Sequence, residues 1–209
     1  KKYHKITHMK INTLNEIGTI NGLWANSYGN GGIIPIQTRF FPSSVFLEYK
    51  LTGLQGDVMK ESMNVAKTLA WSITNNKVQK KLLKEFEMTK QQGIHVHCPD
   101  GSISKDGPSA GTAITVSLFS LFNSKELPNT CGITGEITLN GTITAIGGLY
   151  EKITGGIIAG IETFIIPHDN IRQFDQVKQK YAQKDINIYD KACFHFVKNI
   201  HEVLNILKI

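Results

Sequence analysis

A short loop that turns into an apolar helix constrains this chain more than any other stretch. The loop reads Lys105-Asp106-Gly107-Pro108-Ser109-Ala110-Gly111. Gly107 lets the backbone turn, and Pro108 suits the first helical position because it lacks the N–H that would be unpaired there. The apolar residues that follow predict a buried helix: Ala113, Ile114, Val116, Leu118, Phe119, Leu121 and Phe122. Ser109 is therefore expected in the first turn, where free backbone N–H groups and the positive end of the helix dipole converge.

A hydroxyl in that place can serve as a nucleophile, and the N–H groups around it can hold an oxyanion. The alternative is that Ser109 only caps a core helix. A nucleophilic serine needs a base, and the chain offers no distinctive Ser-His-Asp arrangement. A lysine whose pKa falls on burial is another solution.

Lys152 is the candidate base. It lies just inside a helix start, after Gly147-Gly148, in a stretch that is otherwise apolar on one side. Burial and a positive helix end both lower the pKa of a lysine. The alternative is an ordinary solvated lysine that pairs with Glu151 or Glu162, and composition alone leaves both interpretations open.

The hydrophobic pattern predicts an α+β domain over residues 17–209, preceded by a linker or N-terminal arm over residues 1–16. Strands are expected over 17–28, 33–41 and 45–51 as an antiparallel meander, before helices over 57–72 and 77–90, with Asp57 as the cap of the first. A strand over 129–139 ends at the hairpin signal Asn140-Gly141, and a helix over 149–159 stops at Gly160. Strand–helix units complete the chain.

Charge and cysteine content restrict partners and compartment. The net charge is +6, but the lysines and arginines are scattered, and the most basic stretch, residues 78–84, fits the solvated face of an amphipathic helix. A nucleic-acid partner is therefore only weakly supported. The three cysteines are odd in number and far apart, which favours a reducing intracellular setting. No apolar run approaches ~18 residues, so we expect a soluble chain with no membrane partner.

Two histidines share one face of a short strand predicted over residues 94–99. His95 and His97 alternate with Val96, so their side chains point the same way. Such spacing can bind a metal, but no third ligand is marked, and we predict no metal site. Polar residues that line a cleft, or satisfied structural histidines, are the preferred interpretation.

Three motifs in order resemble the proteolytic domain of the ATP-dependent Lon proteases. They are the loop 105–111, then Thr134-Gly135-Glu136-Ile137-Thr138-Leu139, then Ile146-Gly147-Gly148-Leu149-Tyr150-Glu151-Lys152. The resemblance extends over about 17–209, and the combination is far more specific than any one motif.

The resemblance implies a serine endopeptidase with a Ser–Lys dyad that hydrolyses peptide bonds of unfolded or selected proteins. By that resemblance Ser109 is the nucleophile, Lys152 the base, and Thr134 a neighbour that positions the amine. Glu136, His95 and His97 fall in the surrounding shell, and Asp106 lies in a loop that switches between blocking and open arrangements in relatives.

Family members form homohexameric rings in which an ATPase module, with its ATP and Mg²⁺, precedes the protease domain. No Gly-x-x-x-x-Gly-Lys-[Ser/Thr] occurs here, so these residues hold no ATPase module and need no cofactor themselves. The alternatives are a stand-alone, ATP-independent peptidase and a non-proteolytic scaffold for assembly or DNA binding, which retention of both Ser109 and Lys152 disfavours. The cytoplasm and the mitochondrial matrix are both compatible with such a domain.

Overall fold

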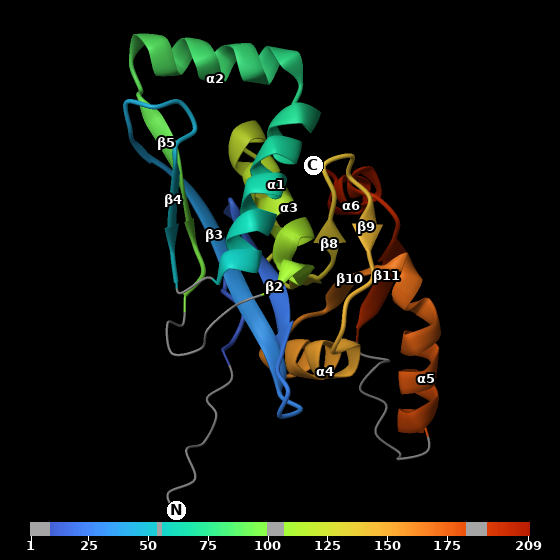
Figure 1. Ribbon diagram of the computed structural model, residues 1–209. Helices are drawn as coiled ribbons and strands as arrows, with labels where there is room; N and C mark the ends of the chain where they lie inside the picture. Colours follow the sequence, from blue (N-terminus) through green and yellow to red (C-terminus); the bar gives the residue numbers. More distant parts are fainter. Residues whose placement is uncertain (1–8, 54–55, 100–106, 183–191) are drawn as a thin grey trace, which may run out of the picture.

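A seven-stranded mixed sheet organises the molecule (Figure 1). The structure is a computed structural model that describes residues 9–53, 56–99, 107–182 and 192–209. In the described residues the strand order is β11-β10-β7-β2-β3-β5-β4. These strands are β2 (Thr19–Ala25), β3 (Gly31–Pro42), β4 (Tyr49–Thr52), β5 (Gln92–His97), β7 (Cys131–Ile133), β10 (Thr163–Pro167) and β11 (Cys193–Val197). Two small ladders accompany them, β1 (Glu16–Ile17) with β6 (Glu126–Leu127) and β8 (Glu136–Ile137) with β9 (Ile143–Thr144).

The antiparallel start of the sheet is confirmed, but the predicted three-stranded meander is wrong in its third strand. β2 and β3 pair antiparallel, from Thr19 opposite Gln37 to Ala25 opposite Gly31. β4 is shorter than expected and pairs in parallel with β5, which lies between β4 and β3. Two helices separate β4 from β5 in the chain, and such a crossover allows parallel pairing. The sequence pattern of residues 45–51 indicated a strand but did not identify the strand with which it pairs.

Six helices lie in the described part of the chain. They are α1 (Asp57–Ile73), α2 (Asn76–Met88), α3 (Gly111–Asn123), α4 (Leu149–Ala159), α5 (Ile171–Ala182) and α6 (Ile200–Leu207). Single 3₁₀ turns, η1 (Pro108–Ala110) and η2 (His168–Asn170), precede α3 and α5. The predicted helices over 57–72, 77–90 and 149–159 are confirmed. The expected cap at Asp57 is wrong, because Gly56 holds the cap position and Asp57 is already helical.

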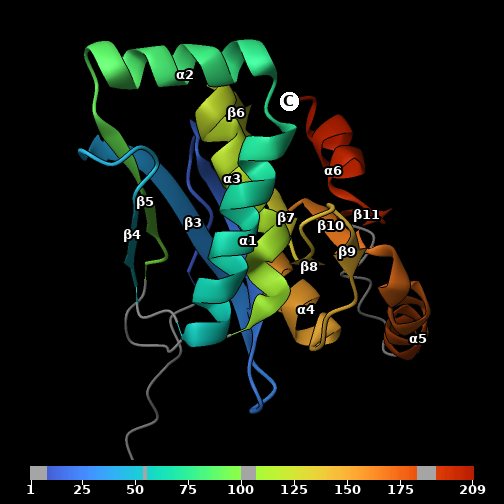
Figure 2. The same ribbon diagram turned by 45° about the horizontal axis from the view of Figure 1, so that its top comes forward.

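Helices cover both faces of the sheet, with α1 and α3 on one face and α4 and α5 on the other (Figures 1 and 2). Alternation along β3 explains this division, since neighbouring side chains point to opposite faces. Ile34 packs in the cluster with α1 and α3, while Ile33 packs with α4. The central helix α3 is buried along almost its whole length, and its Ser117 hydroxyl donates to the Gly18 carbonyl at 2.9 Å. The start of α3 is therefore held in place by a helix that is packed into the core.

The strand predicted over 129–139 is divided in two. β7 ends at Ile133, and β8 begins at Glu136 in a separate ladder with β9. At the break, the Gly135 N–H donates to the Ser109 carbonyl at 2.8 Å instead of continuing a sheet ladder. The sequence pattern showed no interruption, because these hydrogen bonds go to a segment distant in the chain. The predicted hairpin at Asn140-Gly141 is confirmed, with Gly141 at φ 83°.

The described residues before β1 lie against the rest of the domain. The Ile11 N–H donates to the Ala159 carbonyl at 3.2 Å, and the Asn15 side chain accepts from the Asn129 N–H at 3.0 Å. No helix within the described ranges has the length and apolar character that crossing a bilayer requires.

Candidate active site

Ser109 lies in the turn η1, directly ahead of the buried helix α3, as the sequence predicts. Hydrogen bonds fasten this turn to the segment that follows β7. The Ser109 carbonyl accepts from the Gly135 N–H, and the Gly135 carbonyl accepts from the Thr112 N–H at 3.1 Å and the Thr112 hydroxyl at 2.9 Å. The first helical residues and residues 134–135 are thus locked together, which fixes where Ser109 stands.

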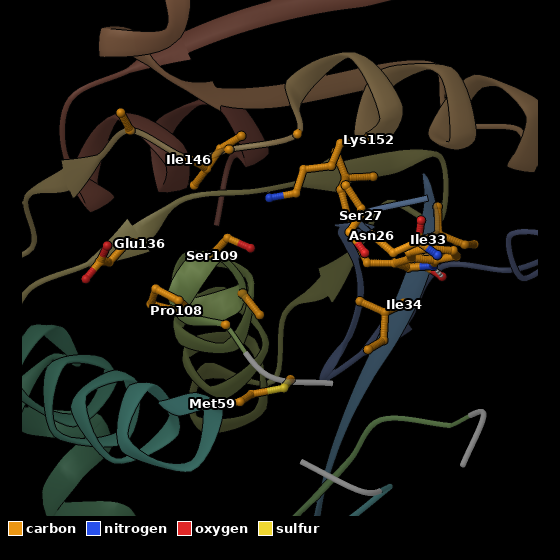
Figure 3. A pocket seen from close by; sticks show the side chains of 18 of the residues that line it. Asn26, Ser27, Ile33, Ile34, Met59, Pro108, Ser109, Glu136, Ile146 and Lys152 are labelled. Carbon is orange, nitrogen blue, oxygen red and sulfur yellow. Dashed lines mark hydrogen bonds between the residues drawn. The ribbon is translucent and has the colours of Figure 1, made fainter. Parts of the chain in front are cut away.

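Thr134 connects this turn to Lys152. The Lys152 amine donates to the Thr134 hydroxyl at 3.2 Å, and that hydroxyl donates onward to the Ser109 carbonyl at 3.4 Å. In Figure 3 the Lys152 side chain extends from α4 toward Ser109. Within the described residues, the amine is hydrogen-bonded to Thr134 and not to the Ser109 hydroxyl. Three residues far apart in sequence therefore meet at one point.

Lys152 is buried, with only 4% of its surface exposed. Removal of the ammonium group from water lowers its pKa from 10.5 to about 8. A larger fraction of this amine than of a solvated lysine amine is therefore neutral near physiological pH. A neutral amine can accept a proton, which a solvated lysine cannot readily do at that pH. The alternative of an ordinary surface lysine paired with Glu151 or Glu162 does not fit this burial.

A cavity of about 500 Å³ opens between Ser109 and Lys152. Most of its walls are apolar, and its floor and sides come from β2, β3, α1, η1 and the segment before α4 (Figure 3). The lining includes Met9, Leu23, Trp24, Ala25, Ile33, Ile34, Met59, Pro108, Ala110, Ala145 and Ile146. Polar contributions come from Asn26, Ser27, Glu136 and the two candidate catalytic side chains. A cleft of this size and polarity fits a segment of a polypeptide with its side chains.

The other predicted site residues are distributed differently. Glu136 lines the cavity, but its exposed carboxylate points away from Lys152 in Figure 3. His95 and His97 do share one face of β5, and both ring systems bond the Thr52 hydroxyl, at 2.8 and 2.7 Å. Neither histidine lines the cavity. Partial burial lowers the pKa of His95, with smaller contributions from Lys50 and His97. Asp106 lies outside the described residues.

Sequence reasoning missed the apolar wall of the cavity and the residue that holds part of it. Trp24 in β2 and Ile33 and Ile34 in β3 are recognisable as strand residues. Only the folded sheet shows that they line the same cavity as Ser109. Asn170 supports part of this wall, because its buried amide hydrogen-bonds the backbone of Ile146. The only sequence signal was an asparagine shortly after a buried strand, and that signal does not reveal that Asn170 bonds Ile146.

A serine at a helix start and a buried lysine amine thus line one largely apolar cleft. The chain belongs to the Lon protease family: residues 2–208 match the Lon protease (S16) C-terminal proteolytic domain. It is thus a Lon-type serine protease domain, as the motifs indicated.

Individual relatives agree with this assignment. The chain is similar to the Lon protease homolog of Acanthamoeba polyphaga mimivirus, with 42% identity over 84% of this chain and 17% of that protein. It is 38% identical to the Lon protease of Clostridium acetobutylicum, over 84% of this chain and 22% of the relative. A third relative is the peroxisomal Lon protease homolog 2 of Pichia angusta, 38% identical over 73% of this chain and 17% of that protein. The chain thus spans about a fifth of the length of these relatives.

Proposed function

We propose that this domain is the endopeptidase of a Lon-type protease and that Ser109 and Lys152 form its catalytic dyad. The observation that carries the proposal is the buried Lys152 amine, held by Thr134 beside the turn that bears Ser109. Burial lowers the lysine pKa toward neutrality, and the first residues of a helix carry backbone N–H groups that lack an intrahelical partner. A base and an anion-stabilising element are thus available to one serine.

In the first step, the Ser109 Oγ attacks the carbonyl carbon of a peptide bond. The neutral Lys152 Nζ accepts the hydroxyl proton as the C–O bond forms. Hydrogen bonds between catalytic groups often tighten only when substrate is bound, so the Thr134-bound amine need shift only within the cavity to reach Ser109. Backbone N–H groups around Ser109 hold the oxyanion of the tetrahedral intermediate.

In the second half of the reaction, Lys152 returns its proton to the leaving amine as the peptide C–N bond breaks. The product is an ester between Ser109 and the acyl portion of the substrate. Water then attacks this ester, Lys152 again takes a proton, and Ser109 is regenerated with release of the carboxylate. Thr134 acts as a positioning residue, because its hydroxyl accepts from the amine and limits where the amine can point.

The apolar cleft favours unfolded or locally extended protein segments as substrates. We propose that an ATPase module, which uses ATP and Mg²⁺, delivers such segments to this domain. We also propose that the protease domains assemble in a hexameric ring. Asp106 is proposed to lie in a loop that opens or blocks the site in that ring. The site remains the same if the domain works as a stand-alone peptidase.

Cleavage of an unfolded protein and a short peptide tests the proposal. We expect the wild type to cleave both, and Ser109→Ala and Lys152→Ala to lose at least about 10³-fold in kcat, the magnitude typical of removing a catalytic residue. Ser72→Ala and Lys125→Ala, which change exposed side chains of the same types, are the matched controls and should retain activity. A serine-reactive fluorophosphonate run in parallel should label the wild type at Ser109. Equal cleavage by Ser109→Ala would exclude the dyad, and a folded wild type with neither labelling nor cleavage would favour the scaffold alternative.

A further inference from the structure

Asn170 makes an unusual set of contacts behind the cavity wall. It lies in η2 and is buried, with 4% of its surface exposed. Its Oδ1 accepts from the Ile146 N–H at 3.0 Å, and its Nδ2 donates to the Ile146 carbonyl at 2.9 Å. Nδ2 also donates to the Gln173 Oε1 at 2.9 Å. One side-chain amide therefore satisfies both polar backbone groups of Ile146, as a neighbouring strand would.

This contact defines the direction of the adjoining peptide groups. The N–H and C=O of one residue point to the same side only when the chain is extended there. The peptide bonds on either side of Ile146 are trans and planar, so the groups across them point the opposite way. The Ala145 carbonyl and the Gly147 N–H consequently face away from Asn170.

The opposite side is the cavity, because Ala145, Ile146 and Gly147 all line it together with Ser109 and Lys152. The Ala145 carbonyl and the Gly147 N–H form no hydrogen bond with any part of the chain that the structure describes. One acceptor and one donor on the same edge are the groups that a strand offers to a neighbouring strand. Exposed edges of this kind bind extended peptides through main-chain hydrogen bonds.

We infer that Asn170 is a positioning residue for substrate: it holds residues 145–147 extended, so that the Ala145 carbonyl and the Gly147 N–H pair with the main chain of a bound polypeptide. The inference rests on the proposed peptidase function and names how that site recognises its substrate. An extended backbone is common to all unfolded sequences, so such pairing selects for lack of structure rather than for particular side chains. The Asn170 amide supplies the donor and the acceptor that Ile146 requires on two separate atoms of one buried side chain.

Peptide binding, measured apart from catalysis, tests this role. The probe is a fluorescent, unstructured decapeptide of small and apolar residues, titrated against Ser109→Ala protein by anisotropy. Adding Asn170→Ala or Asn170→Asp should weaken binding about tenfold, because the main-chain hydrogen bonds between residues 145–147 and the peptide are lost. Gln173→Ala is the matched control, because it removes the third contact of Asn170 and leaves the Ile146 contacts intact; its affinity should not change.

Backbone-modified peptides separate positioning from general damage to the fold. Replacing each amide of the decapeptide in turn by an ester removes one N–H donor at a time. With Asn170 intact, we expect one position to lose about fivefold or more in affinity, the position that pairs with the Ala145 carbonyl. In the Asn170→Ala protein, that same ester should cost no additional affinity. If the Asn170 variants fail to fold, the scan of the protein with Asn170 intact still shows whether binding needs one particular main-chain N–H of the peptide, and a scan with no such position overturns the inference.

A small fluorophosphonate, which has no peptide main chain, distinguishes this inference from the proposed function. It should label Ser109 at the same rate in wild type and Asn170→Asp, while KM for a peptide substrate rises and kcat stays the same. Absence of decapeptide binding, or an ester scan with no sensitive position, overturns the inference even where labelling is normal. Absence of labelling in the wild type instead contradicts the dyad.

Discussion

Burial of Lys152 has a thermodynamic cost that depends on pH. Its pKa is about 8 in the folded protein, compared with 10.5 for a solvated lysine. Below pH 8 both states carry the proton and the folded state bears the full cost, which is up to about 3 kcal/mol for a shift of this size. Between pH 8 and 10.5 the unfolded state binds more protons than the folded state, so the stability of the wild type rises with pH.

We therefore expect Lys152→Met to be more stable than the wild type at pH 7, by up to about 3 kcal/mol. The difference should shrink as the pH rises from 8 to 10.5. Urea unfolding of both proteins across this range measures it. A constant difference between the two proteins at all pH values would show that the Lys152 pKa is not lowered by folding.

The Thr134 hydroxyl is the acceptor that the buried amine uses. Thr134→Val keeps the shape of the side chain but leaves the amine without that partner, and we expect the rate of Ser109 acylation to fall about tenfold or more. Thr134→Ser retains the hydroxyl and should keep most of the rate. Acylation by a fluorophosphonate compares the three proteins. Equal rates for the valine and serine variants would show that the Thr134 hydroxyl does not position the Lys152 amine.

Among the elements, α4 depends on close contact with the start of β3. A Cβ on Gly155 would lie 2.1 Å from the Gly31 carbonyl carbon and 2.4 Å from the Gly32 nitrogen, which are backbone atoms that cannot move aside easily. Only glycine therefore lets this helix lie against the strand. The same helix carries Lys152, so the contact also determines how far the amine reaches into the cavity.

Gly155→Ala is expected to lower the free energy of unfolding by about 1–3 kcal/mol, because overpacking moves α4 off β3. The displacement withdraws Lys152, and acylation of Ser109 should slow in parallel. Ile158→Ala, on the exposed side of the same helix, is the control and should change both quantities little. Thermal unfolding and fluorophosphonate labelling measure the two effects. An alanine variant with wild-type stability would contradict the described contact.

Most individual helices could be predicted from hydrophobic spacing, while strand partners could not. The turn at Pro108, the helix stop at Gly160 and the hairpin at Gly141 follow from local backbone preferences, which a sequence displays directly. The parallel pairing of β4 with β5 and the break at Gly135 depend on contacts between distant segments. Local patterns carry no record of such contacts, so the predicted meander failed at its third strand.

At the scale of the whole molecule, the cavity lies where the two layers of helices meet the end of the central strands. α3 belongs to the hydrophobic cluster on one face of the sheet and α4 to the cluster on the other. Ser109 and Lys152 thus come from opposite sides and meet only when both clusters are packed. Order along the chain and resemblance predicted the pair, but the Ile146 wall and its Asn170 support required the assembled sheet.

The pH dependence of Ser109 acylation shows whether Lys152 acts as the base for Ser109. Intact-mass measurement of the protein with a fluorophosphonate, from pH 6 to 10, gives the rate of adduct formation, and peptide mapping gives its position. We expect one adduct on Ser109, at a rate that rises with pH and levels off above the Lys152 pKa of about 8. An adduct on another residue, or a Lys152→Met protein that reacts as fast as the wild type at every pH, would contradict it.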